Sequence, residues 1–306
     1  MNDKLKILQK TISKQVSFSG IGLHSGNRCN VTLKPGDPDT GIVFIRKDLT
    51  VNNLIPADYR YIHKSNLCTT LKAFNSEAIV LTVEHLLAAI KGNSIDNLII
   101  EVDSQEIPIL DGAAREYDNI IKSVGVISQN NKYKKFLVIK DKIEVKNKKS
   151  ICNISPCNSF EVNCTINFPK PIGTQKISLG KSFESIYKKV MDAKTFCYFE
   201  DIEEMKKVGL AKGGSLENAI VIKDGTILNP NFNYQSDYFA KHKTLDVLGD
   251  FSLMGINIIG SISVYFPGHE LNKLAMQKVF SKFSNYTIYQ FNQTKKFVSK
   301  ESFLSI

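Results

Sequence analysis

The most informative stretch of this 306-residue chain reads Ala240-Lys-His-Lys-Thr-Leu-Asp-Val-Leu-Gly-Asp250 and falls inside a helix predicted over residues 238–254. On a helix, His242 and Asp246 are four residues apart and therefore lie on the same face. Asp250 continues this stripe a further turn on, about 80° round from His242. An imidazole and a carboxylate so placed can converge on one divalent ion, although the same spacing is also typical of an ion pair on a helix surface.

A second predicted helix, over residues 81–92, supplies Glu84 and His85 near its start, with Thr82 as the expected N-cap and Gly92 as the expected end. We expect His85 at the third helical position, where the helix dipole disfavours protonation, and a metal requires the neutral imidazole. Neighbouring side chains on a helix point ~100° apart. Glu84 is therefore better placed to accept a proton from a water beside the metal than to bind the metal. Alternatively, Glu84 is a first-turn acid that stabilises the helix start.

Together the two helices offer two imidazoles and one carboxylate, from His85, His242 and Asp246. This is the ligand set of a hydrolytic zinc site, with the fourth position left for water. Lys243 follows His242 directly and would bind an anionic group of a substrate or stabilise a developing oxyanion; alternatively it is an exposed surface lysine. The sequence therefore predicts a metal centre built from two separate helices.

The remaining histidines carry weaker signals. His269 stands in a predicted loop after a strand, where a histidine can donate a proton, and Asp250 could orient its ring as a buried carboxylate does in hydrolase triads. The alternatives are a loop histidine without function and a simple helix-face acid. His24 lies in a glycine-rich turn that could serve a substrate or only shape the chain, and His63 is expected to be structural or exposed.

Length and composition are those of a globular protein. A chain of 306 residues exceeds the usual single core and predicts two domains. Its 42% hydrophobic and 23% charged residues are ordinary for this class. No apolar run approaches the ~18 residues that cross a bilayer, and the first ten residues lack the apolar core of a secretory signal. We therefore expect a cytoplasmic protein whose six cysteines are free, mostly buried thiols.

The formal net charge of +10 invites comparison with nucleic-acid-binding proteins. Only four of the forty cationic residues are arginines, whereas bidentate recognition of phosphates and bases favours arginine. The lysines are spread along the chain. We therefore expect no nucleic-acid partner, although a positive surface favours an anionic small substrate or an anionic membrane face.

The order of predicted elements indicates an α+β fold. A polar stretch, residues 128–135, is the expected linker between the two domains. Before it, a turn is expected at residues 20–22. Strands are predicted at residues 11–18, 29–33, 41–45 and 97–102, and a helix besides that over residues 81–92 is predicted at residues 113–121. After it, strands are predicted at residues 136–139, 143–145, 160–166 and 259–266, and helices at residues 182–192, 238–254 and 271–284. Strands before helices in both halves suggest separate layers of sheet and helix and not alternating βαβ units.

Several longer motifs occur in an order that resembles the UDP-3-O-acyl-N-acetylglucosamine deacetylase family, zinc hydrolases of early lipid A synthesis. The resemblance extends from Ser17 to His269 and covers most of the chain. The motifs are Ser17-Phe-Ser-Gly-Ile-Gly-Leu-His-Ser-Gly26, Thr82-Val-Glu-His85, Ile95-Asp-Asn-Leu-Ile-Ile-Glu-Val102, Glu106-Ile-Pro-Ile-Leu-Asp-Gly112, Lys194-Thr-Phe196, Gly213-Gly-Ser215, His242-Lys-Thr-Leu-Asp-Val-Leu-Gly-Asp250 and Gly268-His269.

The resemblance implies roles for individual residues. Glu84 matches the family's general base and His269 its general acid, with Asp250 as the carboxylate that orients His269. Thr195 matches the threonine beside the zinc that helps to hold the oxyanion, and Lys243 matches the active-site lysine. Three residues match the family's zinc ligands, with Fe²⁺ as the alternative ion: His85, His242 and Asp246.

The resemblance also implies two similar α+β domains, over residues 1–128 and 134–306. Each domain is a sheet with two helices and a small insert, and the helices are packed between the two sheets. The second insert, about residues 195–221, would enclose the passage for an acyl chain. An apolar stripe on a short helix that ends at Gly209 agrees with such a passage, or with ordinary core packing; its residues are Ile202, Met205 and Val208. The implied substrate-binding residues are these three with Phe196 and Gly214.

The implied activity is hydrolysis of the N-acetyl group of UDP-3-O-[(3R)-3-hydroxyacyl]-N-acetylglucosamine by a monomer with one zinc ion. Its products are acetate and UDP-3-O-acyl-glucosamine, in the committed step of lipid A biosynthesis. Two alternatives are a catalytically silent relative that binds the nucleotide sugar and a basic nucleic-acid-binding protein. The chain departs from the family pattern at Tyr238 and Lys241, where an acidic residue and an arginine are usual, and at Lys170, where a histidine is common.

Overall fold

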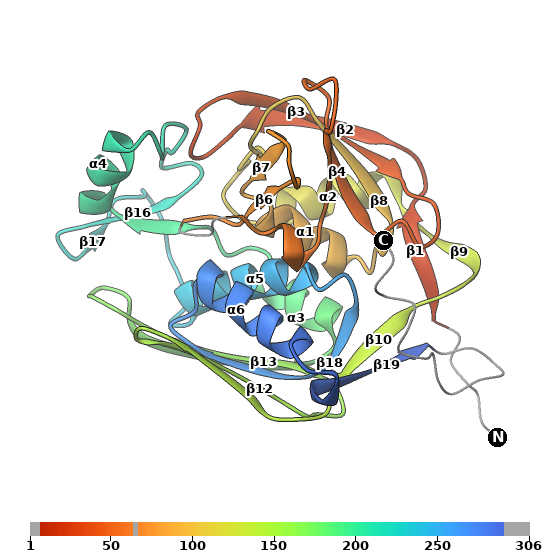
Figure 1. Cartoon of the computed structure of the whole chain (residues 1–306). Coiled ribbons are helices and arrows are strands. Elements are labelled where there is room, and N and C mark those ends of the chain that lie inside the picture. The colour runs from red at the N-terminus through yellow and green to blue at the C-terminus, as the bar shows by residue number, and fades with distance from the viewer. Residues whose placement is uncertain (1–6, 64–66, 291–306) are drawn as a thin grey trace.

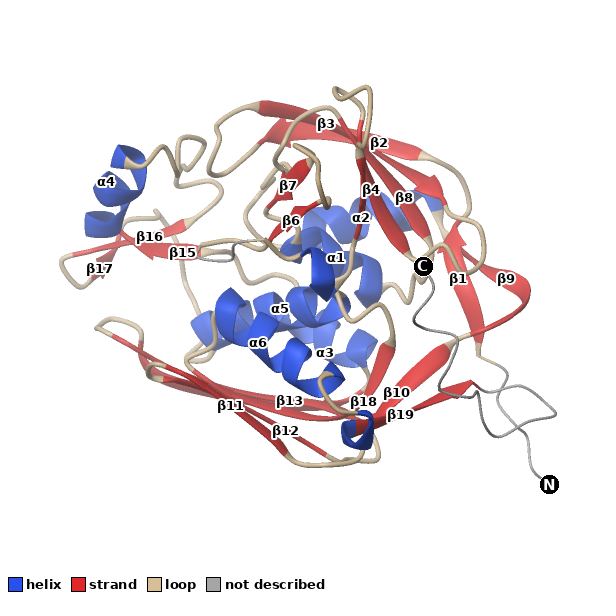
Figure 2. Ribbon diagram, in the orientation of Figure 1, coloured by secondary structure: helices blue, strands red, loops and turns tan. Residues whose placement is uncertain are grey.

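Two β-sheets with a layer of helices between them make up the body of the protein (Figures 1 and 2). The computed structural model describes residues 7–63 and 67–290. Residues 1–6 and 291–306, at the outer ends of the two predicted domains, lie outside the described residues. Residues 1–6 also belong to the segment considered as a secretory signal. The arrangement confirms the predicted α+β class with helices packed between two sheets.

The N-terminal half is built on a five-stranded sheet in the order β2-β3-β8-β4-β5. Its central strand β8 is antiparallel to β3 and parallel to β4. Along β3, Cys29, Val31 and Leu33 are fully buried and alternate with more exposed residues, as a strand with one face on the core requires. The elements are β2 (Val16–Ile21), β3 (Arg28–Pro35), β4 (Ile42–Arg46), β5 (Leu54–Pro56), η1 (Tyr59–Tyr61), β6 (Thr70–Lys72), β7 (Ile79–Leu81), α1 (Glu84–Gly92), β8 (Leu98–Val102) and α2 (Arg115–Val124).

The C-terminal half is built on a seven-stranded sheet with the path β11-β12-β18-β10-β19, to which the hairpin β13-β14 is attached through β18. Helices α3, α5 and α6 pack on this sheet, and a small separate sheet with α4 projects from the body (Figure 1). The elements are β10 (Lys135–Ile139), β11 (Ile143–Asn147), β12 (Ser150–Ser155), β13 (Phe160–Phe168), β14 (Gly173–Lys181), α3 (Phe183–Val190), β15 (Phe196–Tyr198), α4 (Phe199–Lys207), β16 (Ile220–Lys223), β17 (Thr226–Ile227), α5 (Tyr238–Ser252), β18 (Asn257–Tyr265), α6 (His269–Phe280), η2 (Phe283–Asn285) and β19 (Tyr286–Gln290).

The two halves share one chain path. In each, a hairpin (β2-β3 or β11-β12) is followed by a second strand pair (β4-β5 or β13-β14), a helix (α1 or α5), the central strand (β8 or β18) and a last helix (α2 or α6). Strand β18 is antiparallel to β12 and parallel to β13, which repeats the pairing of β8. The prediction of two similar halves is confirmed, and α3 is an additional helix on the second sheet.

Helices α1 and α5 bring the two halves together in the middle of the helix layer. Gly249 of α5 lies directly against the backbone at the start of α1. A Cβ atom at this position would come within 2.1 Å of the Glu84 carbonyl oxygen, so the two helices can approach this closely only with glycine here. The contact places Glu84 and His85, the first two residues of α1, over the middle of α5.

The start of α1 differs from the prediction. Thr82 does not cap the helix, because its φ is 59° and its hydroxyl donates to Glu106 Oε1 at 2.8 Å. Val83 takes the N-cap position without a side-chain hydrogen bond, so His85 is the second helical residue and not the third. His85 still lies in the first turn, where the helix dipole acts.

Two further predictions are wrong. The expected linker, residues 128–135, is mostly strand: β9 (Val126–Tyr133) pairs with β1 (Leu8–Ile12). Backbone groups make this pairing, so a polar sequence can supply it as well as an apolar one. His269 does not lie in a loop; it is the first residue of α6, after Gly268 at the N-cap. The domain boundary itself stays a prediction.

Smaller differences concern the first strands. The strand predicted over residues 11–18 is divided between β1 and β2, and Gly20 pairs regularly with Cys29 inside β2. The turn expected at residues 20–22 comes slightly later, where Gly22 and Asn27 are hydrogen bonded. The helix predicted over residues 113–121 is α2, which is shifted towards the C-terminus.

Other expectations agree with the structure. The six cysteines are free and four of them are buried, and His63 is exposed. Within residues 7–63 and 67–290, none of the helices has the length and apolar character needed to cross a membrane.

Candidate active site

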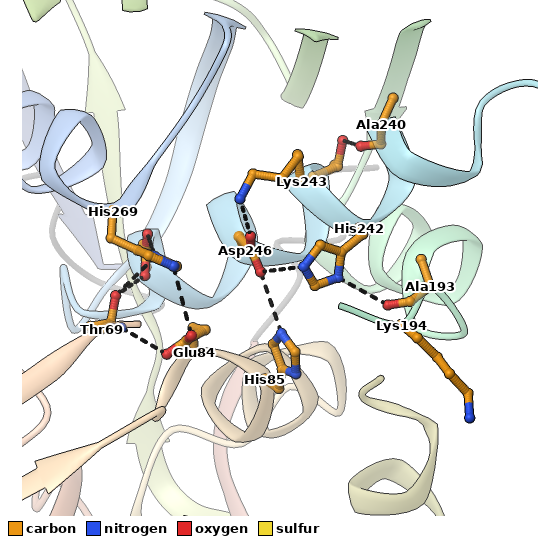
Figure 3. Close-up of polar contacts among 12 residues, drawn as sticks. Thr69, Glu84, His85, Ala193, Lys194, Ala240, His242, Lys243, Asp246 and His269 are labelled. Carbon is orange, nitrogen blue, oxygen red and sulfur yellow. Dashed lines mark hydrogen bonds and ion pairs between the residues drawn. The ribbon is translucent and has the colours of Figure 1, made fainter. Parts of the chain in front are cut away.

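Three buried side chains from α1 and α5 converge on one point (Figure 3). His85 Nε2 and His242 Nε2 lie 3.4 Å and 3.5 Å from the same oxygen, Asp246 Oδ1. The ligand atoms of the three residues lie within 4.8 Å of one another. Two imidazoles and a carboxylate are donors that suit Zn²⁺ and also Fe²⁺. The residues therefore fit a divalent metal ion.

The surroundings keep His242 and Asp246 in the forms that bind a metal. Burial lowers the pKa of His242 to about 3, so its imidazole is neutral. His242 Nδ1 lies 3.2 Å from the Ala193 carbonyl oxygen, which suits donation from Nδ1 and leaves the lone pair of Nε2 facing Asp246. Burial acts to raise the pKa of Asp246, but His242 and Lys243 hold it well below its usual range. Lys243 Nζ donates to Asp246 Oδ2 at 2.7 Å.

A carboxylate and a histidine face each other beside the three ligands. Glu84 Oε1 lies 3.7 Å from His269 Nε2, and the other ring nitrogen, Nδ1, lies 2.8 Å from Asp250 Oδ2. Burial acts to lower the pKa of His269, but Asp250 and Glu84 outweigh it and raise this pKa to about 9. Burial raises the pKa of Glu84, against the effect of His269. The pair combines a proton acceptor with an imidazole that is protonated at neutral pH.

These groups open into one cavity of about 230 Å³ with walls from both halves. Thr195 and Lys243 line it together with Glu84, His269 and the three ligands, whereas Asp250 is buried behind His269. The N-terminal half contributes the further wall residues Leu23, His24, Leu67, Thr82 and Ile109. The C-terminal half contributes Phe168, Phe196, Cys197, Tyr198, Asp201, Met205 and Gly268. The cavity thus joins a polar centre to a partly apolar wall.

The insert of the C-terminal half reaches further than predicted, from Phe196 at the start of β15 to Ile227 at the end of β17. Phe196 and Met205 line the cavity, but Ile202 and Val208 do not. Val208 is 72% exposed, so the apolar stripe as a whole neither faces this cavity nor packs into the core.

The insert is joined to the glycine-rich turn of the N-terminal half. The Gly213 and Lys212 N–H groups donate to the carbonyl oxygens of Leu23 and His24 at 3.0 and 3.2 Å. Gly214 lies beside Leu23, which lines the cavity. The wall of the cavity on this side is therefore continuous between the two halves.

Thr195 is held in the wall by its neighbours. Its N–H donates to the Gly112 carbonyl oxygen and its carbonyl accepts from Ile220, both at 2.8 Å. The Tyr238 hydroxyl, at one departure from the family pattern, accepts the N–H of Lys194 at 2.9 Å and so fixes the residue before Thr195. The other two departures do not line the cavity: Lys241 pairs with Asp237, and Lys170 is exposed.

Two residues at the centre had a weak signal or none in the sequence. His24 lines the cavity, and both of its ring nitrogens are buried without a hydrogen-bond partner among residues 7–63 and 67–290. Thr69 is buried and contacts Glu84, Asp250 and His269, yet sequence reasoning missed it. A threonine just before a short strand matches no chemical motif, so a single sequence gives no signal for it.

A buried His-His-Asp cluster next to a carboxylate and a protonated imidazole is the arrangement of a metal-dependent hydrolase. The sequence pattern of the UDP-3-O-acyl N-acetylglycosamine deacetylases matches residues 9–281 of the chain. The chain belongs to this family, which is metal-dependent, and the resemblance seen in its motifs is confirmed.

Curated relatives agree with this assignment, and each is named UDP-3-O-acyl-N-acetylglucosamine deacetylase. The chain is 42% identical to the protein of Myxococcus xanthus over 92% of its own length and 88% of the relative's. It is 37% identical to the protein of Syntrophus aciditrophicus, over 92% and 89%. It is 39% identical to that of Haemophilus influenzae, over 90% of each chain.

Proposed function

We propose that this protein removes the N-acetyl group from UDP-3-O-[(3R)-3-hydroxyacyl]-N-acetylglucosamine, giving acetate and UDP-3-O-acyl-glucosamine, the committed step of lipid A biosynthesis. The observation that carries the proposal is the convergence of three metal-binding side chains with Glu84 and His269 in one cavity. The names of the relatives supply the substrate.

Glu84 and His269 divide the proton transfers. Glu84 takes the proton of the attacking water as a C–O bond forms at the acetyl carbon. His269, protonated at neutral pH, gives a proton to the nitrogen as the C–N bond breaks. Asp250 orients His269 through the bond to Nδ1. Thr195 donates a hydrogen bond to the oxyanion of the tetrahedral intermediate.

His85, His242 and Asp246 would hold the metal ion. When bound there, Zn²⁺ would act as a Lewis acid and lower the pKa of water towards about 7. Two histidines and one carboxylate also suit Fe²⁺, so metal analysis of protein isolated without added zinc identifies the ion. Lys243 keeps Asp246 ionised and meets negative charge on the substrate.

The insert of the C-terminal half binds the acyl chain. Phe196 and Met205 form the apolar wall next to the reacting groups. Ile202, Val208 and Gly214 belong to the same insert but do not line the cavity, and they would meet the part of a long chain that extends beyond it. The positive charge of the protein favours the diphosphate of the substrate.

We further propose that the protein works in the cytoplasm as a monomer without nucleic acid. Light scattering of the purified protein tests its mass, and titration with polynucleotide at two salt concentrations tests nucleic-acid binding. Salt-sensitive binding of polynucleotide, combined with no acetate release, would favour the alternative of a basic nucleic-acid-binding protein.

The direct test is acetate release from the acylated UDP-sugar by purified protein, with metal content measured on the same sample. We expect turnover that a chelator abolishes and that Zn²⁺ or Fe²⁺ restores. A catalytically silent relative would bind the UDP-sugar but release no acetate at any metal loading.

A further inference from the structure

Thr69 contacts both the proposed acid, His269, and the proposed base, Glu84. Its N–H donates to Glu84 Oε2 at 3.0 Å. Its Oγ1 lies 2.5 Å from Asp250 Oδ1 and 3.1 Å from His269 Nδ1. Thr69 stands just before β6 in the N-terminal half, whereas Asp250 and His269 belong to α5 and α6 of the other half. One residue therefore contacts reacting groups from both halves (Figure 3).

The contacts define the direction of the hydroxyl hydrogen bond. Thr69 is 1% exposed, so its hydroxyl has no access to solvent and must donate inside the protein. Asp250 offers the nearer and negatively charged acceptor, Oδ1. The opposite oxygen, Oδ2, accepts from His269 Nδ1 at 2.8 Å and from Asn272 Nδ2 at 2.7 Å. With both oxygens bonded, the Asp250 carboxylate cannot rotate away from His269.

We infer that Thr69 is a positioning residue, whose hydroxyl fixes the Asp250 carboxylate so that His269 Nε2 stays directed at the reaction centre beside Glu84. This inference rests on the proposed deacetylase activity. The Thr69 carbonyl oxygen also accepts the Val83 N–H at 3.4 Å, which ties the residue to the start of α1. The spacing between acid and base is thereby set by one buried residue outside both α1 and α6.

Substitution can separate the positioning role of Thr69 from a role in folding, because its hydroxyl bonds Asp250 whereas its N–H bonds Glu84. Thr69→Val has nearly the same shape and keeps the N–H bond to Glu84, but it removes the hydroxyl. Thr69→Ser keeps both. Thr70→Val is the matched control: Thr70 is the next residue and is also buried, and its hydroxyl lies 3.7 Å from Cys68 Sγ, which is not one of the groups that Thr69 contacts.

The first readout is kcat and KM for acetate release with the metal content checked. We expect Thr69→Val to lower kcat by roughly tenfold to a hundredfold, the range for groups that orient a functional side chain, with KM and metal content unchanged. Thr69→Ser should stay close to wild type, and Thr70→Val should be unchanged.

The second readout is the alkaline limb of the pH profile, which reports His269. The charged and titratable groups that face this ring are Asp250 and Asp246 of α5, Glu84 of α1 and His24 of the glycine-rich turn. None of these residues is changed in Thr69→Val. A freed Asp250 carboxylate would stabilise the imidazolium less, so we expect the limb to move to lower pH in Thr69→Val and to stay in place in both other variants.

Three results would overturn the inference: a wild-type kcat in Thr69→Val, an alkaline limb that does not move to lower pH, or a loss of activity that Thr69→Ser shares. If Thr69→Val has lost its cooperative thermal transition, Thr69→Ala is judged by the same readouts, since it also lacks the hydroxyl. An inactive wild-type enzyme with full metal would instead contradict the proposed function, so the two failures can be told apart.

Discussion

The N-terminal and C-terminal halves follow the same chain path but contribute unequally to the active site. Their equivalent helices, α1 and α5, cross at Gly249. Helix α1 contributes only its first two residues, Glu84 and His85, and continues as a buried apolar helix. Helix α5 carries a polar stripe along its length, with His242, Asp246 and Asp250.

The difference shows how one fold, present twice, can divide a reaction. In the proposed mechanism the N-terminal half supplies the proton acceptor and one metal ligand, both from the first turn of α1. In the same proposal the C-terminal half supplies two ligands and the proton donor, and its insert supplies the apolar wall. In this account neither half can hold the metal or perform the reaction alone.

The largest effect on rate is expected from replacing Glu84, the proposed base in the N-terminal half. Glu84→Gln keeps the size of the side chain and leaves the three ligands intact, so it should retain the metal while acetate release falls by roughly 10²–10⁴-fold, the usual contribution of a general base. Steady-state kinetics with metal analysis checks this. Near wild-type turnover would move the base to another residue and remove the proposed division between the halves.

The proposed acid of the C-terminal half, His269, should determine how activity depends on pH. The pKa of His269 is raised to about 9, so the ring is a cationic donor below this pH, and activity should fall as pH rises through it. His269→Ala should lower the rate by about 10²-fold and remove this alkaline limb.

His24 of the N-terminal half is the matched comparison for His269. Burial lowers the pKa of His24, so its ring is already neutral at the pH values of the alkaline limb. His24→Ala should therefore keep the alkaline limb, whatever its effect on rate. If His269→Ala kept the limb and His24→Ala lost it, the acid would belong to the other half.

The crossing of the two helices should be sensitive to a single methyl group. Gly249→Ala would place a Cβ atom against the Glu84 carbonyl oxygen, and overpacking of this kind typically costs about 1–3 kcal/mol in the free energy of unfolding. Ser252→Ala, on the same helix, should change stability by less than about 0.5 kcal/mol. Chemical denaturation compares the two variants, and equal stability would mean that the crossing is not tightly constrained.

The insert of the C-terminal half should act on the acyl chain, whereas an exposed residue of the N-terminal half should not. Met205→Ala, in the insert of the C-terminal half, removes apolar surface worth about 1.5 kcal/mol or more when buried, so kcat/KM for the acylated substrate should fall about tenfold. Phe74→Ala, at an exposed position between β6 and β7 of the N-terminal half, is the control. A substrate without the acyl group should not distinguish Met205→Ala from wild type; if it does, the wall serves the sugar and not the chain.

The sequence was sufficient to predict features that depend on local spacing. The i, i+4 pair His242 and Asp246 needs only helical periodicity, and the alternation of Cys29, Val31 and Leu33 needs only a strand with one buried face. The fold class followed from the order of these elements. The ligand types suggested that α1 and α5 converge, and the resemblance supported this hypothesis, because the contact at Gly249 is tertiary and has no local signature.

Other features were beyond local reasoning for physical reasons. Strand β9 is polar, and its pairing with β1 depends on backbone groups that every sequence has. The helix at His269 begins without a side-chain cap, so it lacks the usual start signal. Thr82 resembles a cap but binds Glu106 instead. Thr69 acquires its contacts with Asp250 and His269 only when residues about 200 positions apart in the chain meet.

We propose that both halves together hold one metal ion. The most direct test is the metal content of purified His85→Ala and His242→Ala, one ligand from each half, with Glu84→Gln as the control that leaves all ligands in place. We expect both ligand variants to lose most of their metal while the control keeps a full equivalent per chain. A full equivalent in either ligand variant would contradict a shared site.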